Sequence, residues 1–275
     1  MIIKVIIFFI AYIVVSSCDY KIAIINELDE SFFVDKERIT KIIAHRGYWD
    51  TKGSCENSLA SITKAADIGV DGLECDIWIT ADDSVVVNHD PTHGGMVIRN
   101  NRYSDLAKVF LPNGECFPLF RQYIDVLKKY PDLILFIEIK DPASVDQMIK
   151  IIDSADLENE TVFMSFNKAV CEWLIKMDPQ YKVQLLQGDG NPIMCKSLAS
   201  KGFFGIAYSL SFYNKTNSII DDAKKNSLYL SAWTLTNSEQ YDWLFDKQFD
   251  YAITDIPSML VNKTKGDMKY WKPVY

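Results

Sequence analysis

The chain has 275 residues, 48% of them hydrophobic, and a formal net charge of −8 with a pI near 5.0. Its length and the absence of low-complexity tracts favour one large globular domain, because a closed α/β barrel commonly uses a chain of this size. The negative net charge and the lack of any Lys/Arg-rich run argue against nucleic acid as a partner, since nucleic-acid binding depends on clustered positive charge.

The first 18 residues have the features of a processed signal segment rather than of a folded element. Lys4 supplies a positive charge, an apolar run extends over Val5–Val15, and two small residues precede Cys18. The apolar run is too short for an ordinary membrane span. The quartet Val15-Ser16-Ser17-Cys18 resembles the bacterial lipobox, in which the cysteine becomes the lipidated first residue. We therefore expect a lipid anchor on Cys18, with an uncleaved anchor or plain secretion as the alternatives.

This interpretation predicts a membrane-anchored protein of the bacterial cell envelope, on the periplasmic side of the inner membrane or at the outer membrane.

The other cysteines are scattered and include no CxxC pair, which argues against a disulfide framework and against a zinc site. The chain is expected to have four parts: a signal peptide over residues 1–18, a tether over residues 19–38, a barrel domain over residues 39–265 and a tail over residues 266–275.

Short β-branched runs alternate with amphipathic stretches after the tether, which is typical of βα units around a parallel sheet. Eight such runs predict a single (β/α)8 barrel of the TIM type. The expected strands are Lys41–His45, Gly72–Ile79, Leu133–Lys140, Thr161–Phe166, Lys182–Gln187, Phe204–Ser209, Leu228–Leu235 and Tyr251–Thr254. The expected helices are Asn57–Ile68, where Ser58 suits an N-cap, Leu119–Tyr130, Val145–Ser154, Lys168–Lys176, Pro192–Ser200, Ser218–Lys225 and Ser238–Phe245.

One further β-branched run, Ser84–Asp90, follows the second strand too closely for a parallel crossover, so it is predicted to fold back as an antiparallel hairpin strand. A turn centred on Ala81 and Asp82 would place His89 opposite Glu74, because the loop sets the register of a hairpin. The polar stretch from residue 90 to residue 117 has little periodicity. We expect it to form an active-site loop or a small cap.

Two strands carry charged residues on a face that should be buried. In the second strand, alternation sends Glu74 and Asp76 to one face, where two desolvated carboxylates need a cation or hydrogen-bond donors. The third strand repeats the arrangement with Glu138 and Lys140. A hard divalent cation is the natural partner of these carboxylates. The alternative for the third strand is a simple ion pair between Glu138 and Lys140 at the rim of the barrel.

The end of the first strand supplies the next candidates, because barrel enzymes place catalytic groups at the carboxyl ends of strands. His45 is a candidate for acid–base work, and Arg46 can neutralise a phosphate oxygen with its planar guanidinium group. The chain has only three histidines, so a partner for His45 must be His89 or His93. His89 directly follows a strand whereas His93 lies in a Gly-rich segment, and we therefore expect His89.

Several segments together make the chain similar to the glycerophosphodiester phosphodiesterase family over essentially its whole mature length. No segment is specific to this family by itself, but the order and spacing of the segments together are. They are His45-Arg46-Gly47, Glu56-Asn57-Ser58, Gly72-Leu73-Glu74-Cys75-Asp76, Thr80-Ala81-Asp82, Val86-Val87-Asn88-His89-Asp90, Ile137-Glu138-Ile139-Lys140, Ser165-Phe166, Ala232-Trp233-Thr234 and Thr254-Asp255.

The resemblance implies a (β/α)8 barrel and a phosphoric diester hydrolase that needs one divalent cation, Ca²⁺ or Mg²⁺. It implies that Glu74, Asp76 and Glu138 are the metal ligands, that His45 is the proton acceptor and that His89 is the proton donor. The residues expected to contact the substrate are Arg46, Glu56, Lys140 and Trp233. Trp233, like Phe166, lies near the end of a strand. Two roles therefore remain open for Trp233: stacking on the alcohol part of the substrate and packing in the core.

The expected substrate is a small phosphodiester, cleaved to glycerol phosphate and an alcohol, or a lysophospholipid-type diester. The nucleophile is either water or a neighbouring hydroxyl of the substrate, which proximity would make effective. Two alternatives remain at this stage: a related phospholipase D-like or C-like barrel enzyme acting on intact phospholipid, and an inactive binding lipoprotein. The sequence does not determine the oligomeric state.

Overall fold

The computed structural model describes residues 36–158, 160–188, 190 and 193–273. The predicted signal peptide and Cys18 lie outside these residues, as does most of the predicted tether. Among the described residues, no helix has both the length and the apolar character that crossing a membrane requires. Two compact units are present: a small one that includes β1 (Lys36–Arg38) paired with β13 (Trp271–Pro273), and a large one, Ile39–Tyr270, that contains the barrel.

Eight parallel strands close into a barrel, which confirms the predicted fold class. Each strand pairs with the next, and β2 pairs with both β3 and β12, so that no edge stays open. The barrel strands are β2 (Lys41–Ala44), β3 (Gly72–Ile79), β7 (Ile134–Ile139), β8 (Thr161–Ser165), β9 (Lys182–Gln187), β10 (Gly205–Ser209), β11 (Tyr229–Leu235) and β12 (Tyr251–Thr254). The sequence predicted every one of them to within about one residue.

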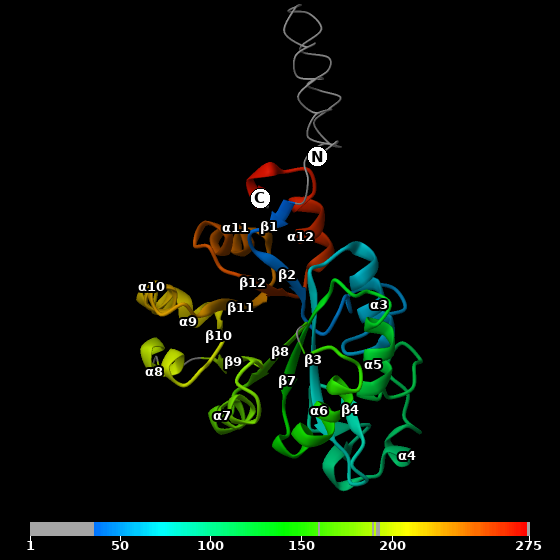
Figure 1. The fold of residues 1–275 in the computed structure, drawn as a ribbon. Helices are drawn as coiled ribbons and strands as arrows, with labels where there is room; N and C mark the ends of the chain where they lie inside the picture. The colour runs from blue at the N-terminus through cyan, green and yellow to red at the C-terminus, as the bar shows by residue number, and fades with distance from the viewer. Residues whose placement is uncertain (1–35, 159, 189, 191–192, 274–275) are drawn as a thin grey trace, which may run out of the picture. The chain divides into compact units, whose positions relative to one another are not determined.

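Helices surround the barrel on its outside (Figure 1). They are α3 (Leu59–Ile68), α5 (Phe120–Leu127), α6 (Val145–Asp153), α7 (Lys168–Met177), α8 (Cys195–Ser200), α9 (Leu210–Lys215), α10 (Ser218–Lys225), α11 (Ser238–Asp246) and α12 (Pro257–Thr264). The short α9 and the closing helix α12 were not predicted. The expected cap is confirmed, because the Ser58 side chain accepts a hydrogen bond from the backbone N–H of Ser61 at the start of α3.

The predicted hairpin strand is present as β4 (Val85–Val87), antiparallel to β3, but its predicted register is wrong by one residue. Val87 pairs with Ile77, and the backbone N–H of Asn88 donates to the carbonyl of Asp76 at 3.0 Å, so Asn88 takes the place opposite Asp76. The cause is a three-residue loop in place of a two-residue turn. Asp83 in this loop has the left-handed φ of 60°, which is typical of the last residue of such loops.

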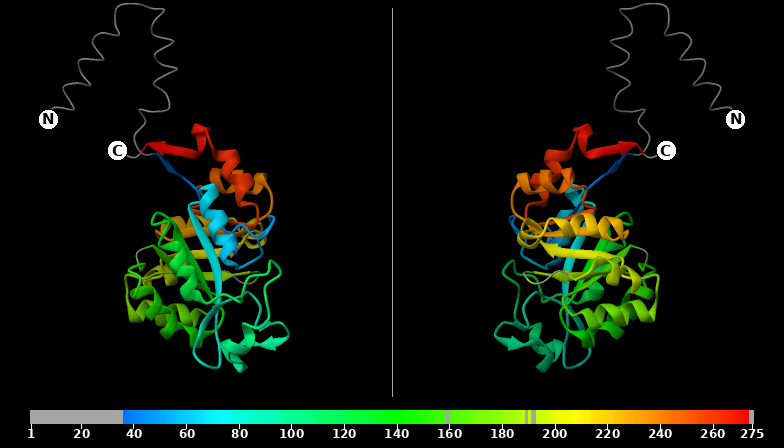
Figure 2. Two further views of the ribbon diagram at one scale, coloured as in Figure 1. Left: turned by 90° about the vertical axis from the view of Figure 1, so that its right-hand side faces the viewer. Right: turned by 90° about the vertical axis from the view of Figure 1, so that its left-hand side faces the viewer.

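The segment between β4 and α5 has a small core of its own and projects from one end of the barrel (Figure 2). It contains β5 (Thr92–His93), β6 (Met96–Val97) and α4 (Tyr103–Leu106). The Glu115 carboxylate ties it to the start of α3, because its two oxygens accept the backbone N–H groups of residues 59 and 60 at 2.9 and 3.0 Å. This segment is therefore a folded insertion rather than a plain loop.

Much of the interior of the barrel is apolar, although it also contains a buried hydrogen bond of 2.7 Å from Ser231 to Gln184. Part of the apolar interior forms a wall of the site described below. The apolar residues form a buried cluster to which six of the eight barrel strands contribute: Ile43, Phe136, Val162, Met164, Leu186, Ala207, Tyr251 and Ile253. Such a packed interior is usual for this architecture, in which the strands supply layers of branched side chains and leave no pore.

Candidate active site

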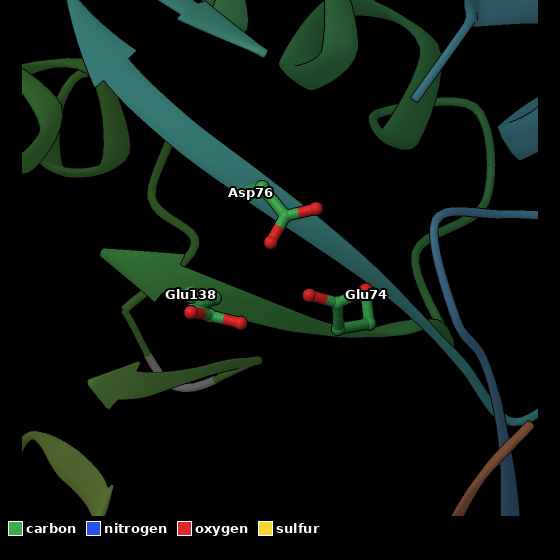
Figure 3. Close-up of side chains that lie close together, drawn as sticks. All are labelled: Glu74, Asp76 and Glu138. Atoms are coloured by element: carbon green, nitrogen blue, oxygen red, sulfur yellow. The ribbon is translucent and has the colours of Figure 1, made fainter. Parts of the chain in front are cut away.

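Three carboxylates meet on the inner sides of β3 and β7, as Figure 3 shows. Asp76 pairs with Glu138 in the parallel register, and Glu74 lies two residues before Asp76 on the same face of the strand. One oxygen of each carboxylate lies within 4.8 Å of one oxygen of each of the others. Glu74 and Asp76 are buried and Glu138 is nearly so. The juxtaposition that strand alternation suggested is therefore present.

The electrostatics of these carboxylates favour a bound cation. Burial, followed by the charges of Asp76 and Glu138, holds the pKa of Glu74 well above its usual range. Burial and the neighbouring Asp76 raise the pKa of Glu138 to about 7. Like charges out of water persist only if positive charge compensates them. Three carboxylate oxygens at this spacing form a donor set that suits a hard divalent ion such as Ca²⁺ or Mg²⁺.

Lys140 supplies part of that compensation. Its ammonium group lies 2.7 Å from Oε1 of Glu138 and 3.2 Å from Oδ1 of Asp76. The ion pair that the sequence offered as an alternative is thus present, but it is joined to the carboxylate cluster and does not stand alone at the rim. Burial would lower the pKa of Lys140, yet the charges of Asp76 and Glu138 outweigh burial and raise it, so Lys140 stays protonated.

Arg46 borders the same cluster. Its backbone N–H donates to Oε2 of Glu74 at 2.9 Å, and its guanidinium group contacts Glu56 at 2.6 Å and Asp76 at 3.5 Å. The next residue, Gly47, has φ 79°, and a Cβ atom there would lie 2.4 Å from Oγ of Ser61. Only glycine therefore lets this turn pack against α3, which explains the Arg-Gly pair after the first strand.

Asn57 is a site residue that the sequence analysis did not single out. Its Nδ2 donates to Oδ2 of Asp76 at 2.9 Å, and its Oδ1 lies 3.4 Å from the backbone nitrogen of Asp76. The side chain therefore fixes the orientation of one carboxylate of the cluster. Its place in the segment Glu56-Asn57-Ser58, directly before a helix, was the only available signal, and that signal also fits a helix cap.

His45 follows β2 and lies beside Asp255, which follows the neighbouring strand β12. Its Nδ1 is 2.7 Å from Oδ1 of Asp255, and its Nε2 is 3.9 Å from Oε2 of Glu74. The Trp49 indole N–H also donates to Oδ1 of Asp255, at 3.2 Å. Asp255 was quoted among the family-like segments, but sequence reasoning gave it no role.

His89 lies just after β4 and lines the same pocket as His45, Glu74 and Glu138. Its Nδ1 is 2.9 Å from Oδ1 of Asp90, and its side chain is 41% exposed. The sequence analysis chose His89 because it directly follows a strand, and His89 lines the pocket although the predicted hairpin register was wrong by one residue.

His93, the other candidate, is buried in the insertion and does not line that pocket. Its Nε2 bonds the carbonyl of Val109 at 2.8 Å, and its ring stacks on Phe117 with a centroid distance of 4.0 Å. These contacts give His93 a packing position within the insertion.

The pocket at the mouth of the barrel has a volume of about 140 Å³ and two unlike halves. The half over β2, β3, β4 and β7 is polar, and the half over β8, β9, β11 and β12 is apolar. Trp233 lines the apolar half, where its indole N–H donates to the carbonyl of Ala207 and its ring meets the edge of Phe166 at a centroid distance of 5.6 Å. Trp233 therefore packs against the core and also lines the pocket, while its stacking on the alcohol of the substrate stays a prediction.

The fold and the site define a class: a (β/α)8 barrel enzyme with an acidic cluster and two histidines at the mouth of its barrel. The family model of the glycerophosphoryl diester phosphodiesterase family matches residues 45–259. The chain belongs to this family, and the predicted enzyme class, phosphoric diester hydrolase, is confirmed.

Individual relatives agree with this membership. A glycerophosphodiester phosphodiesterase of Caldanaerobacter subterraneus subsp. tengcongensis is 28% identical, with 81% of this chain and 97% of the relative covered. The crystal structure of a glycerophosphodiester phosphodiesterase from Parabacteroides distasonis has a TM-score of 0.77 and 30% identity, over 82% of this chain and 97% of that one. An Oleispira antarctica phosphodiesterase in complex with the product sn-glycerol-3-phosphate has a TM-score of 0.72 and 19% identity, over 81% and 95% of the two chains.

Proposed function

We propose that this chain hydrolyses glycerophosphodiesters to glycerol phosphate and an alcohol, by acid–base catalysis from two histidines and with one divalent cation. The observation that carries the proposal is the meeting of His45, His89, Glu74 and Glu138 in one pocket, with Asp76 completing the carboxylate cluster. Residues that serve only to stabilise a fold seldom bring so many desolvated charges together, because the mutual repulsion and lost hydration of these charges oppose folding.

Glu74, Asp76 and Glu138 would hold the cation, and their oxygen donors suit Ca²⁺ or Mg²⁺. When bound, such an ion stabilises the negative charge that develops on a phosphoryl oxygen during displacement. Arg46 and Lys140, which line the same pocket, bind the non-bridging oxygens and orient the phosphorus atom toward the nucleophile. Glu56 holds the Arg46 guanidinium group in place for this task.

The two histidines move protons in this proposal. His45 removes the proton of the nucleophile through Nε2, because its Nδ1 is occupied by Asp255. His89 gives a proton to the departing alkoxide, which is a poor leaving group without one. The nucleophile is water, or a neighbouring glycerol hydroxyl that attacks through a cyclic phosphate, and both routes require the same two proton transfers.

The apolar half of the pocket favours a second candidate substrate, a lysophospholipid-type diester. Phe166 is 51% exposed on this side, next to Trp233, and the wall continues with Met164 and Leu186. An acyl or alkyl chain laid over this wall would bury apolar surface, which a polar head group would not gain. Intact phospholipids belong to this second class of candidate substrates.

A panel of substrates tests both candidates. We expect hydrolysis of glycerophosphodiesters to cease after dialysis against chelator and to return with Ca²⁺ or Mg²⁺. Lysophospholipids and intact phospholipids are assayed in parallel, and their kcat/KM values decide whether the apolar wall is used for a chain. Full activity in excess chelator would exclude the metal, and no cleavage of any glycerophosphodiester would exclude the proposed substrate class.

We further propose that a lipid on Cys18 anchors the enzyme to a membrane of the bacterial cell envelope. The support is the lipobox-like quartet at the end of an apolar run with a positive charge before it. Cys18→Ser is expected to release the protein from the membrane fraction or to block its maturation. An unchanged distribution, together with an unchanged mass of the mature form, would contradict the anchor.

A further inference from the structure

We infer that Asp255 is a positioning residue that holds His45 in the tautomer and orientation needed for proton abstraction. The hydrogen bond between His45 Nδ1 and Asp255 Oδ1 is 2.7 Å long, which is short for a nitrogen donor and typical of a charge-assisted bond. The inference rests on the proposed role of His45 as the base.

The backbone dictates that these two residues meet. Strands β2 and β12 are parallel neighbours in which Ala44 pairs with Thr254, so the next residue of each strand lies beside the other. The backbone N–H of His45 donates to the carbonyl of Thr254 at 3.0 Å, and that of Asp255 donates to the carbonyl of Leu235 at 3.0 Å. Both residues are therefore held by the barrel itself, which makes their spacing precise.

The chemistry of the pair sets the tautomer. An ionised carboxylate only accepts hydrogen bonds, so Nδ1 of His45 carries the hydrogen and the lone pair of a neutral ring lies on Nε2. Nε2 points toward the carboxylate cluster, 3.9 Å from Oε2 of Glu74. Burial would raise the pKa of Asp255, but the hydrogen bonds from His45 and Trp49 outweigh it and lower the pKa, so Asp255 stays ionised.

His89 and Asp90 provide a matched pair, and His89 lines the same pocket as His45. Their bond is 2.9 Å long, but Asp90 is the next residue in the chain and its side chain is 72% exposed, against 27% for Asp255. Water can replace an exposed carboxylate as hydrogen-bond acceptor, whereas the half-buried Asp255 has no such substitute. Asp90→Asn is therefore the control for Asp255→Asn.

The experiment compares kinetics of the full chain at saturating Mg²⁺ on an alkyl and an aryl phosphodiester. In Asp255→Asn, the amide can donate to Nδ1 and force the hydrogen onto Nε2, so kcat should fall on the order of 10²–10⁴-fold on both substrates, with KM nearly unchanged. Asp90→Asn should lose less than about tenfold. The double variant His45→Ala/Asp255→Asn should be no slower than His45→Ala, because a positioning residue has no effect once its target is gone.

Nitrogen NMR of the His45 ring gives a readout that does not depend on turnover. The wild-type ring should have its hydrogen on Nδ1, and the ring in Asp255→Asn should have it on Nε2. Full kcat in Asp255→Asn, additive losses in the double variant, or a hydrogen on Nε2 in the wild type would each overturn the inference. Full activity of His45→Ala would instead refute the proposed base, and a slow His45→Ala beside a normal Asp255→Asn would refute the positioning role alone.

Discussion

The two halves of the pocket at the mouth of the barrel are built on opposite principles. The polar half is held together by charges that need one another, such as Lys140 between Asp76 and Glu138. The apolar half is the exposed top of the barrel core, where Met164, Leu186 and Ile253 belong to the buried cluster and also line the pocket. The polar half therefore forms against the mutual repulsion of its carboxylates, whereas the apolar half forms by packing alone.

This difference predicts a division of labour. The polar half contains every pocket residue proposed to bind phosphate, move a proton or hold the cation, so changes there should lower kcat, except where an activated leaving group needs no proton. The apolar half contains no titratable group among the residues that line it, so changes there should alter KM and should do so differently for different alcohols. The following predictions test that division, from the largest effect to the smallest.

Loss of one proposed metal ligand is expected to have the largest effect. Asp76→Asn removes one negative donor from the cluster, and Lys140 and Asn57 lose a charged partner as well. Because a bound ion contributes several kcal/mol of charge stabilisation, kcat/KM should fall on the order of 10⁴-fold on every substrate. The control is Glu172→Gln on α7, which replaces an exposed carboxylate paired with Lys201 and should leave kcat/KM unchanged. Metal titration by calorimetry should show the matching loss of affinity.

The two histidines should differ in their dependence on the leaving group. His89→Ala should slow hydrolysis of an alkyl diester about 10³-fold and spare an activated aryl diester, whose weakly basic leaving group needs no proton. His45→Ala should slow both, because the nucleophile must lose its proton in either case. His93→Ala should show no such selectivity, since His93 packs on Phe117. Equal losses on both substrates in His89→Ala would refute the assignment of the acid.

The polar half should also make the metal-free protein sensitive to pH. Glu138 has a pKa raised from 4.5 to about 7, so the folded chain binds more protons than the unfolded one between these values. Stability of the metal-free protein should therefore fall as pH rises through this window, by up to about 3 kcal/mol. Glu74, raised in the same direction by burial, adds to the fall.

Denaturant unfolding at pH 5 and pH 8, with chelator and with Mg²⁺, checks this prediction. The stabilisation by metal should be greater at pH 8, because the carboxylates are ionised there and the ion relieves their repulsion. Glu138→Gln should flatten the metal-free profile. A metal-free protein that is more stable at pH 8 than at pH 5 would contradict the sign.

The sequence predicted the strands because β-branched runs mark them, and it predicted the carboxylate cluster because side chains alternate with a period of two along a strand. Glu74 and Asp76 share a face wherever that strand lies, and a parallel sheet brings the carboxylate of β7 alongside. Helix α12 was missed because it follows β12 almost at once and shows only a weak amphipathic pattern over its eight residues. The hairpin register failed at Asp83, since a left-handed residue other than glycine leaves no clear mark in the sequence.

The residues that hydrogen-bond the proposed catalytic groups were the hardest to predict. Asn57 and Asp255 contact side chains that are 19 and 210 residues away in the chain, so these contacts exist only in the folded barrel. The strand assignments contained part of the answer for Asp255, because residues that follow neighbouring parallel strands meet at the same rim. Applying that rule to every pair of adjacent strand ends would have selected His45 and Asp255 together.

The smallest expected effect lies in the apolar half, at Phe166. The side chain is 51% exposed and makes a T-shaped contact with Trp233, so Phe166→Ala should fold normally. If an alkyl or acyl group lies on this ring, losing it should raise KM about tenfold for diesters with an apolar alcohol, which corresponds to about 1.4 kcal/mol of lost burial. Diesters with a small polar alcohol should keep their KM, and kcat should stay the same for both kinds.

Val97→Ala, which removes an exposed apolar side chain from the insertion, is the control. An equal rise in KM for both kinds of diester would mean that Phe166 shapes the pocket as a whole, and a fall in kcat alone would end the division between a reactive half and a binding half.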